Sequence, residues 1–143
     1  MDVSNDSKPY DDKLIPKDQL NNAIEQAKKE NKYVLLQFGG NWCGWCILMH
    51  KYFNSTEEVK KVLNSNFVYV HINNETDKSF CETYAPSLQA YPHLSVVSSE
   101  GKLIAEQPTD QLEEGNGYNE QRVLQFLNGG IIENDHSCKK SWK

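Results

Sequence analysis

The feature that most constrains the fold is a short apolar segment that ends at two glycines and leads into a pair of cysteines. Residues 33–38 (YVLLQF) are mostly apolar and too few for a typical helix. Gly39 and Gly40 end the segment. A run of this kind is typical of a strand buried on both faces in a sheet that helices cover. The sequence therefore predicts a layered α/β domain built around residues 33–38.

Helical and strand patterns alternate along the chain. The expected helices cover residues 18–32, 43–53, 55–63, 77–84 and 119–127, and the further strands cover residues 67–72, 94–98 and 102–106. The early alternation predicts a parallel strand pair joined by a crossover helix, and the late strands form an antiparallel hairpin. The predicted fold class is α/β, with a central mixed sheet flanked by helices.

The chain of 143 residues fits one domain with a sizeable core. Residues 1–16 are polar, include two prolines, and are predicted to form a loose N-terminal arm. The domain itself is expected to cover residues 17–130. Residues 131–143 follow a pair of glycines and are interpreted as a C-terminal tail.

Charge and hydropathy exclude two classes of partner. The net charge is −5, and the basic residues form no cluster larger than a lysine pair, which argues against nucleic-acid binding. The longest purely aliphatic run is residues 34–36, so no segment is expected to span a membrane. The first residues are polar and acidic, without a signal peptide. We expect a soluble monomer, either cytoplasmic or exported with its leader removed.

Cys43 and Cys46 carry the main functional prediction. The chain has four cysteines, too few for a disulfide scaffold at this length. Cys43 opens a predicted helix, where free backbone N–H groups and the helix dipole favour a thiolate. At about pH 7, a drop in thiol pKa from about 8.5 to about 7 raises the ionised fraction of the thiol by roughly an order of magnitude. Cys43 is therefore the expected nucleophile, and Cys46, three residues on and deeper, is the expected resolving thiol.

Two other roles for the cysteine pair are weaker. A zinc site needs about four ligands, and the sequence has no second Cys-x-x-Cys motif. His50 shares a helical face with Cys46, but we expect it to be a surface or half-buried residue. A purely structural disulfide is the other alternative, and neither a metal nor a cofactor is predicted.

Residues 34–46 (VLLQFGGNWCGWC) resemble the active-site strand and turn of the thioredoxin superfamily. The likeness extends from about residue 20 to residue 127, and the Asn-Trp-Cys order resembles exported bacterial disulfide reductases and isomerases. The resemblance implies a thioredoxin-like fold and a thiol:disulfide oxidoreductase that acts on protein substrates. It also implies a separate redox partner and a location outside the cytoplasm, in the periplasm or secreted.

The family also has a cis-proline that faces the dithiol and precedes a strand. Tyr91 and Pro92 match that position, and a cis bond would turn the backbone of Tyr91 outward toward a bound peptide. The resemblance makes Tyr91, Pro92, Trp42, Gly44 and Trp45 the candidate substrate-binding residues. Of the two tryptophans, we expect Trp42 to be packed in part and Trp45 to be exposed.

Two positions depart from the family pattern. Thioredoxins have a buried acid six residues before the first cysteine, where this chain has Gln37. Gly44 and Trp45 stand between the cysteines, so no imidazole is present there to favour the thiolate. This argues against a strong oxidant and favours the reductase or isomerase direction. The reduction potentials of the reducing and the strongly oxidising members of the family differ by about 150 mV, or roughly 7 kcal/mol.

Cys81 and Cys138 leave alternatives open. Cys81 is interpreted as a buried free thiol, and a Cys81–Cys138 disulfide that ties the tail to the domain is the alternative. The rival to an enzyme is a thioredoxin-fold binding module that holds a metal ion or a client protein without redox turnover.

Overall fold

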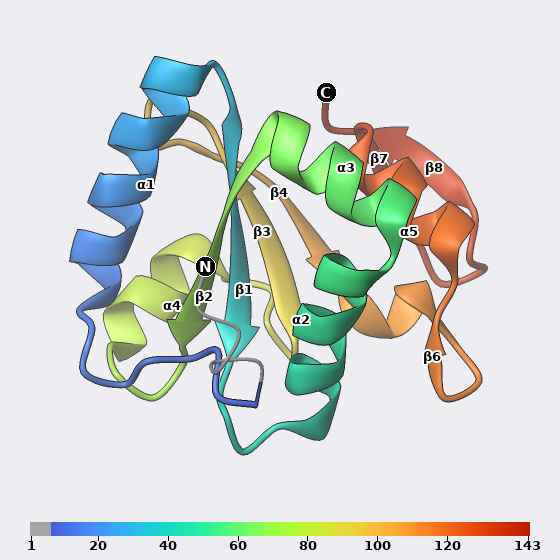
Figure 1. Cartoon of the computed structure of the whole chain (residues 1–143), viewed down its shortest axis with the longest axis horizontal. Helices are drawn as coiled ribbons and strands as arrows, with labels where there is room; N and C mark the ends of the chain where they lie inside the picture. The colour runs from blue at the N-terminus through green and yellow to red at the C-terminus, as the bar shows by residue number, and fades with distance from the viewer. Residues whose placement is uncertain (1–6) are drawn as a thin grey trace.

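The computed structural model describes residues 7–143 and contains a four-stranded mixed sheet with helices on both faces (Figure 1). The strands are β1 Tyr33–Gly39, β2 Phe67–Asn73, β3 His93–Val97 and β4 Leu103–Pro108. Their order across the sheet is β2-β1-β3-β4. β1 pairs with β2 in parallel and with β3 antiparallel, and β3 pairs antiparallel with β4. The predicted α/β class and mixed sheet are confirmed.

The helices form two layers. α1 Pro16–Glu30 and α4 Lys78–Tyr84 cover one face of the sheet, and α2 Gly44–Ser55, α3 Glu57–Asn66 and α5 Glu120–Leu127 cover the other (Figure 1). α2 and α3 form the crossover between the parallel strands β1 and β2, which cannot be joined by a tight turn.

β1 is the central element, and its side chains alternate between the two layers. Val34, Leu36 and Phe38 pack in the core under α1 and α4, whereas Leu35 packs in the core on the α2 side. Gln37 has the same parity as Leu35 and is fully buried. The period of the strand therefore places an amide directly beneath the beginning of α2.

The N-terminal arm is held more firmly than the sequence predicts. α1 begins at Pro16, where a proline suits the first helical position. Before it, Tyr10 is only 2% exposed and belongs to the apolar cluster around Cys43 and Cys46. The prediction of a loose arm is therefore wrong at Tyr10, because burial of its ring fixes that part of the chain. Residues 1–6 of the predicted arm lie outside the described residues.

The C-terminal tail folds back as a hairpin. β7 Gly130–Ile132 pairs antiparallel with β8 Cys138–Ser141. Trp142 then packs against the rings of Tyr33, Phe67 and Phe126, and its Nε1–H donates to the Phe126 carbonyl over 2.8 Å. The interpretation of residues 131–143 as a simple tail is incomplete, because an indole that finds both apolar contacts and an acceptor docks on the domain.

The segment between β4 and α5 also has short regular structure. It contains the 3-10 turn η2 Thr109–Leu112 and the strands β5 Glu113–Glu114 and β6 Gly117–Tyr118. Leu112 and Tyr118 are buried in the core, which explains why the segment is ordered.

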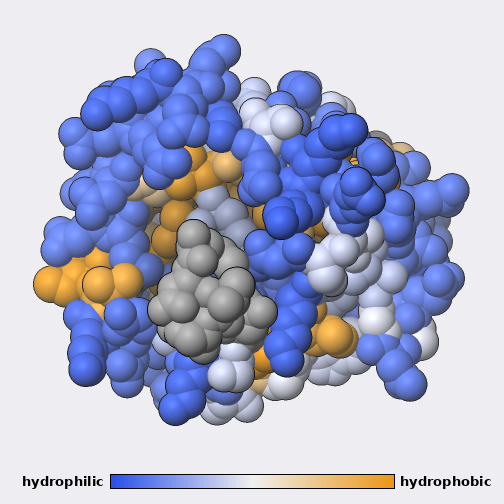
Figure 2. Space-filling view, in the orientation of Figure 1, coloured by the Kyte–Doolittle hydropathy of each residue, from blue (hydrophilic) through white to orange (hydrophobic). Residues whose placement is uncertain are grey.

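The surface is largely hydrophilic on the face shown in Figure 2. Among residues 7–143, the exposed large apolar side chains are Leu14, Ile15 and Trp42. Within the same residues, no helix is both long and apolar enough to cross a membrane.

Docking of the C-terminal hairpin predicts a stability effect. Trp142→Ala removes three ring contacts and one hydrogen bond, so the free energy of unfolding should fall by about 2–3 kcal/mol. Chemical denaturation measures this, with the exposed Lys61→Ala as a control that should change stability by less than about 0.5 kcal/mol. Equal stabilities of the two variants would show that the hairpin does not dock on the domain.

Candidate active site

The first thiol sits at the beginning of α2. Cys43 is the residue that caps this helix, and its Sγ accepts a hydrogen bond from the backbone N–H of Cys46 over 3.2 Å. Cys43 keeps 9% exposure, whereas Cys46 has none. An N–H donor and the positive end of the helix dipole both stabilise negative charge on this sulfur. The geometry therefore suits Cys43 to attack a disulfide.

The second thiol lies one turn deeper. Cys46 is fully buried on the inner side of α2. Burial, followed by the hydrogen bond with Cys43, raises the pKa of the Cys46 thiol to about 12. Cys46 therefore stays protonated near neutral pH. The two thiols have different environments even though they are only one helical turn apart.

The loop before β3 faces this dithiol. The Tyr91–Pro92 peptide bond is cis, as predicted. Tyr91 packs against the cluster of Tyr10, Cys43 and Cys46, and its ring meets the edge of Trp42 with centroids 5.3 Å apart. The structure therefore brings Trp42 and the Tyr91–Pro92 loop together beside the cysteines.

The sequence predicts that Trp42 is packed in part and Trp45 exposed, but the structure shows the reverse. Trp42 is 56% exposed, whereas Trp45 is partly buried and packs edge-on against Tyr118 at 5.5 Å. Trp45 lies in the first turn of α2 and packs on Tyr118 of β6, while Trp42 precedes the helix and packs against Tyr91. A side chain at Gly44 would meet no atom within 4 Å, so the surface beside Cys43 is open.

Gln37 occupies the position under Cys46 that holds an acid in the family pattern. Its Nε2 donates to the Tyr10 hydroxyl over 2.7 Å and to the Cys46 carbonyl over 3.1 Å. Its Oε1 accepts from the hydroxyl of Tyr69. No aspartate or glutamate is buried among residues 7–143. The polar side chains of this network, which lies beside Cys46, are thus all neutral.

Tyr10 is the site residue that sequence reasoning missed. Asn41, two residues before Cys43, accepts from the Tyr10 N–H over 2.9 Å and donates to the Tyr10 carbonyl over 2.6 Å. These two bonds fasten the arm to the active-site turn. The available signal was that Tyr10 is the only aromatic residue among residues 1–16.

His50 is buried, which corrects the prediction of a surface or half-buried residue. Its Nδ1 lies 3.1 Å from Nε2 of His71 on β2, so the second histidine covers it. Across residues 7–143, no group of three or more His, Cys, Asp or Glu side chains is arranged to hold a metal ion. The zinc alternative therefore finds no ligand set in that range.

The remaining cysteines lie apart from the dithiol. Cys81 is a half-buried free thiol on α4, with Sγ 3.6 Å from the Asn74 carbonyl. Cys138 is an exposed free thiol on β8. Neither is paired, and the free-thiol interpretation of Cys81 agrees with the structure.

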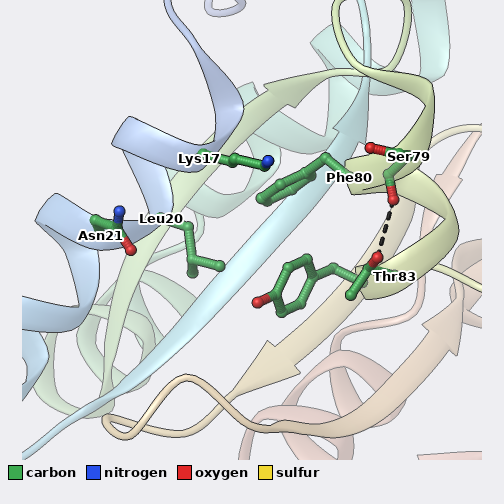
Figure 3. A pocket seen from close by; sticks show the side chains of 7 residues that line it. Lys17, Leu20, Asn21, Ser79, Phe80 and Thr83 are labelled. Carbon is green, nitrogen blue, oxygen red and sulfur yellow. Dashed lines mark hydrogen bonds between the residues drawn. The ribbon is translucent and has the colours of Figure 1, made fainter.

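A separate cavity of about 330 Å³ lies between α1 and α4 (Figure 3). Lys17 and Leu20 line it from α1, and Phe80 and Thr83 line it from α4. Its lining contains no cysteine, histidine or acid, so it carries none of the chemistry of the dithiol.

The sheet order, the paired thiols at the start of α2 and the cis-proline loop define a dithiol protein of thioredoxin fold. The chain belongs to the thioredoxin-like family, whose model matches residues 15–99, more than half of its length. This confirms the resemblance and the fold expected from the sequence.

Comparison with solved structures supports the fold. A disulphide isomerase from Xylella fastidiosa Temecula1 superposes with a TM-score of 0.71 at 24% identity, covering 84% of this chain and 94% of that chain. A thioredoxin from Thermus thermophilus gives a TM-score of 0.55 at 17% identity, covering 76% of this chain and 80% of that chain.

Curated relatives match a smaller region. Spermatogenesis-associated protein 20 of Mus musculus is 35% identical over 68 residues, which is 48% of this chain and 9% of the relative. The human protein of the same name is 32% identical over 68 residues, again 9% of its length. The chain thus spans less than a tenth of the length of these relatives.

The different environments of the two thiols predict selective alkylation. At pH 8 the raised pKa and complete burial of Cys46 leave little thiolate to react, so iodoacetamide should label Cys43 at least about 100-fold faster. Peptide mass spectrometry of the reduced protein over time measures both rates. Labelling of Cys46 at a rate equal to Cys43 would contradict the geometry described above.

The buried histidine pair predicts acid sensitivity. Burial, aided by repulsion from His50, lowers the pKa of His71 to about 3. In the unfolded chain His71 takes up a proton near pH 6.5, and in the folded chain it resists until about pH 3. Its contribution to stability is therefore complete above pH 6.5 and declines as the pH falls.

Between pH 6.5 and 4.5 this loss should amount to about 2–3 kcal/mol of unfolding free energy. Urea denaturation at a series of pH values measures it, and His71→Gln should flatten the decline. The exposed His136→Gln serves as the matched control and should leave the decline unchanged. Identical pH profiles for wild type and His71→Gln would refute the assignment.

Proposed function

We propose that this protein is a thiol:disulfide oxidoreductase that acts on protein disulfides, with Cys43 as the attacking thiol and Cys46 as the resolving thiol. The observation that carries the proposal is the asymmetry of the pair. Cys43 lies at the helix start, accepts an N–H and can be reached, while Cys46 lies one turn below it and is fully buried. A resolving thiol must be near the first sulfur but protected from external reagents.

The reaction proceeds in two displacements. The Cys43 thiolate attacks one sulfur of a substrate disulfide, forms a mixed disulfide and releases the other sulfur as a thiolate that takes up a proton. Cys46 then loses its proton and attacks Cys43 Sγ, so the Cys43–Cys46 bond forms and the bond to the substrate breaks. The released substrate sulfur also takes up a proton. Two electrons have passed from the protein dithiol to the substrate, and a separate redox partner restores the dithiol.

The surface around Cys43 supports a polypeptide substrate. Trp42 offers an exposed aromatic face, and Gly44 leaves the approach to Cys43 open. The cis Tyr91–Pro92 loop lies across from the dithiol, where the backbone of Tyr91 can pair with an extended chain. Trp45 is partly buried and packs on Tyr118, so it offers less exposed surface to a substrate than Trp42 does.

The direction we favour is reduction or isomerisation. The Gly44–Trp45 pair supplies no imidazole, which in strongly oxidising members would stabilise the thiolate, and the network under Cys46 is neutral. We also propose that the protein acts outside the cytoplasm, since disulfides persist in oxidising compartments.

The second candidate is a thioredoxin-fold module that holds a metal ion or a client protein without turnover. The observation that favours it is the closed, carboxylate-free environment of Cys46, which slows the loss of its proton. Stoichiometric metal binding together with absence of turnover would select this alternative.

Insulin reduction in the presence of dithiothreitol tests the enzyme. The wild type should accelerate the appearance of turbidity, and Cys43→Ser should lose this activity. Cys46→Ser should instead accumulate a mixed disulfide at Cys43, since resolution is removed but attack is not. The control is Cys81→Ser, which alters a thiol outside the site and should keep full activity. A wild type that leaves the uncatalysed rate unchanged would refute the proposed enzyme.

A further inference from the structure

The proposed reaction needs a group that stabilises the thiolate of Cys46, and the expected carboxylate is absent. Cys46 must lose its proton before it can attack Cys43. Gln37 stands in the place of the acid, but its Nε2 is occupied by the Tyr10 hydroxyl and the Cys46 carbonyl. Gln37 therefore touches the backbone of Cys46 rather than its sulfur. The inference that follows deepens the proposed function and rests on it.

Tyr10 brings the missing donor to the Cys46 sulfur. A methyl group placed on Gly39 would lie 2.3 Å from Cys46 Sγ and 2.9 Å from the Tyr10 hydroxyl oxygen, so both atoms face the same point at the end of β1. Tyr10, Cys43 and Cys46 form one buried cluster. The Tyr10 hydroxyl and the Cys46 sulfur therefore lie close to each other inside this cluster.

The network around Tyr10 leaves its hydroxyl proton available. The Gln37 Nε2–H donates to the Tyr10 oxygen, which leaves the hydroxyl proton free to point at Cys46. Tyr69 holds Gln37 in this orientation by donating to its Oε1. The ring of Tyr10 is held edge-on to His71 at 5.1 Å, and its backbone is bonded twice to Asn41. The hydroxyl is thus positioned before the reaction begins.

We propose that Tyr10, carried by the N-terminal arm, donates a hydrogen bond to the Cys46 thiolate and so replaces the carboxylate that this chain lacks. In the resolving step the Cys46 thiol gives its proton to solvent, its sulfur attacks Cys43 Sγ, and the Tyr10 hydroxyl stabilises the charge until the new S–S bond forms. Tyr10 itself neither gains nor loses a proton. The arm is therefore part of the active site.

The other titratable groups near Cys46 do not replace this role. They are Cys43 on α2, Tyr69 and His71 on β2, Tyr91 before β3, and Tyr118 on β6. The Tyr69 hydroxyl donates to Gln37 Oε1, and the Tyr118 hydroxyl donates to the Trp45 carbonyl. The Tyr91 hydroxyl lies against Asn74, from which it accepts a hydrogen bond. Burial raises the pKa of Tyr10, which keeps its hydroxyl available as a donor.

Single-turnover reaction with limiting 5,5′-dithiobis(2-nitrobenzoate) separates the two steps. The first thionitrobenzoate is released when Cys43 attacks, and the second is released when Cys46 resolves the mixed disulfide. Tyr10→Phe removes the hydroxyl and keeps the ring, so the second phase should slow by roughly 10-fold or more, as for loss of a hydrogen bond to a charged group. The first phase should be unchanged. Tyr33→Phe, which removes a hydroxyl at the other end of β1, should match wild type in both phases.

The pH profile separates a donor from a merely structural residue. Loss of the donor should shift the rise of the second phase to higher pH, whereas loosened packing would admit water and shift it to lower pH. An unchanged second phase, a shift to lower pH, or equal slowing of both phases would overturn the role of Tyr10.

A second readout does not depend on turnover. Titration of the Cys46 Cβ resonance by NMR in the reduced protein should move to higher pH in Tyr10→Phe and stay in place in Tyr33→Phe. If wild type fails to release the second thionitrobenzoate, the proposed function fails, and this titration alone decides the hydrogen bond. An unmoved Cys46 titration in Tyr10→Phe would refute the bond in either case.

Discussion

The close approach of α2 to the end of β1 is the constraint on which the site depends. Cys46 Sγ lies where any side chain on Gly39 would have to stand, so the helix can press its inner face onto the strand only because that residue is glycine. This contact buries Cys46 completely and leaves Cys43 at the edge. The complete burial of Cys46 thus depends on the missing Cβ atom of Gly39.

The burial of Cys46 makes its thiol harder to ionise, and the side chains beside it form a neutral hydrogen-bond network. A thiol inside an apolar cluster resists ionisation, and in this protein no buried acid lies beside it among residues 7–143. An amide on β1 and phenols from the arm and β2 supply hydrogen bonds instead of charge. Such a network costs less to bury than a carboxylate, because its members are neutral and satisfy one another.

Both ends of the described chain dock on the domain through an aromatic residue. The N-terminal arm reaches the active-site turn through Tyr10 and Asn41, and the C-terminal hairpin covers the opposite part of the core through Trp142. In each case one aromatic residue within a polar stretch finds an apolar site and a hydrogen-bond partner. The ordered part of the chain therefore extends beyond the limits set by residues 17–130.

The sequence by itself determined the sheet, the helices and the dithiol, because these depend on local periodicity and on neighbours a few residues apart. Apolar runs, the Gly-Gly break and the Cys-x-x-Cys spacing are all readable in one dimension. Even the unusual amide at Gln37 could be recognised by its distance from Cys43. Only the tertiary structure decided which side chains complete the site.

Tyr10 is 31 residues from Asn41 and 27 from Gln37, and no local pattern encodes those contacts. The same holds for the burial of His50 by His71 and for the exchanged exposure of Trp42 and Trp45. Short polar segments carry weak signals because their conformation is set by what they dock against. For such segments the fold must form first, and the contacts it offers then decide where the chain lies.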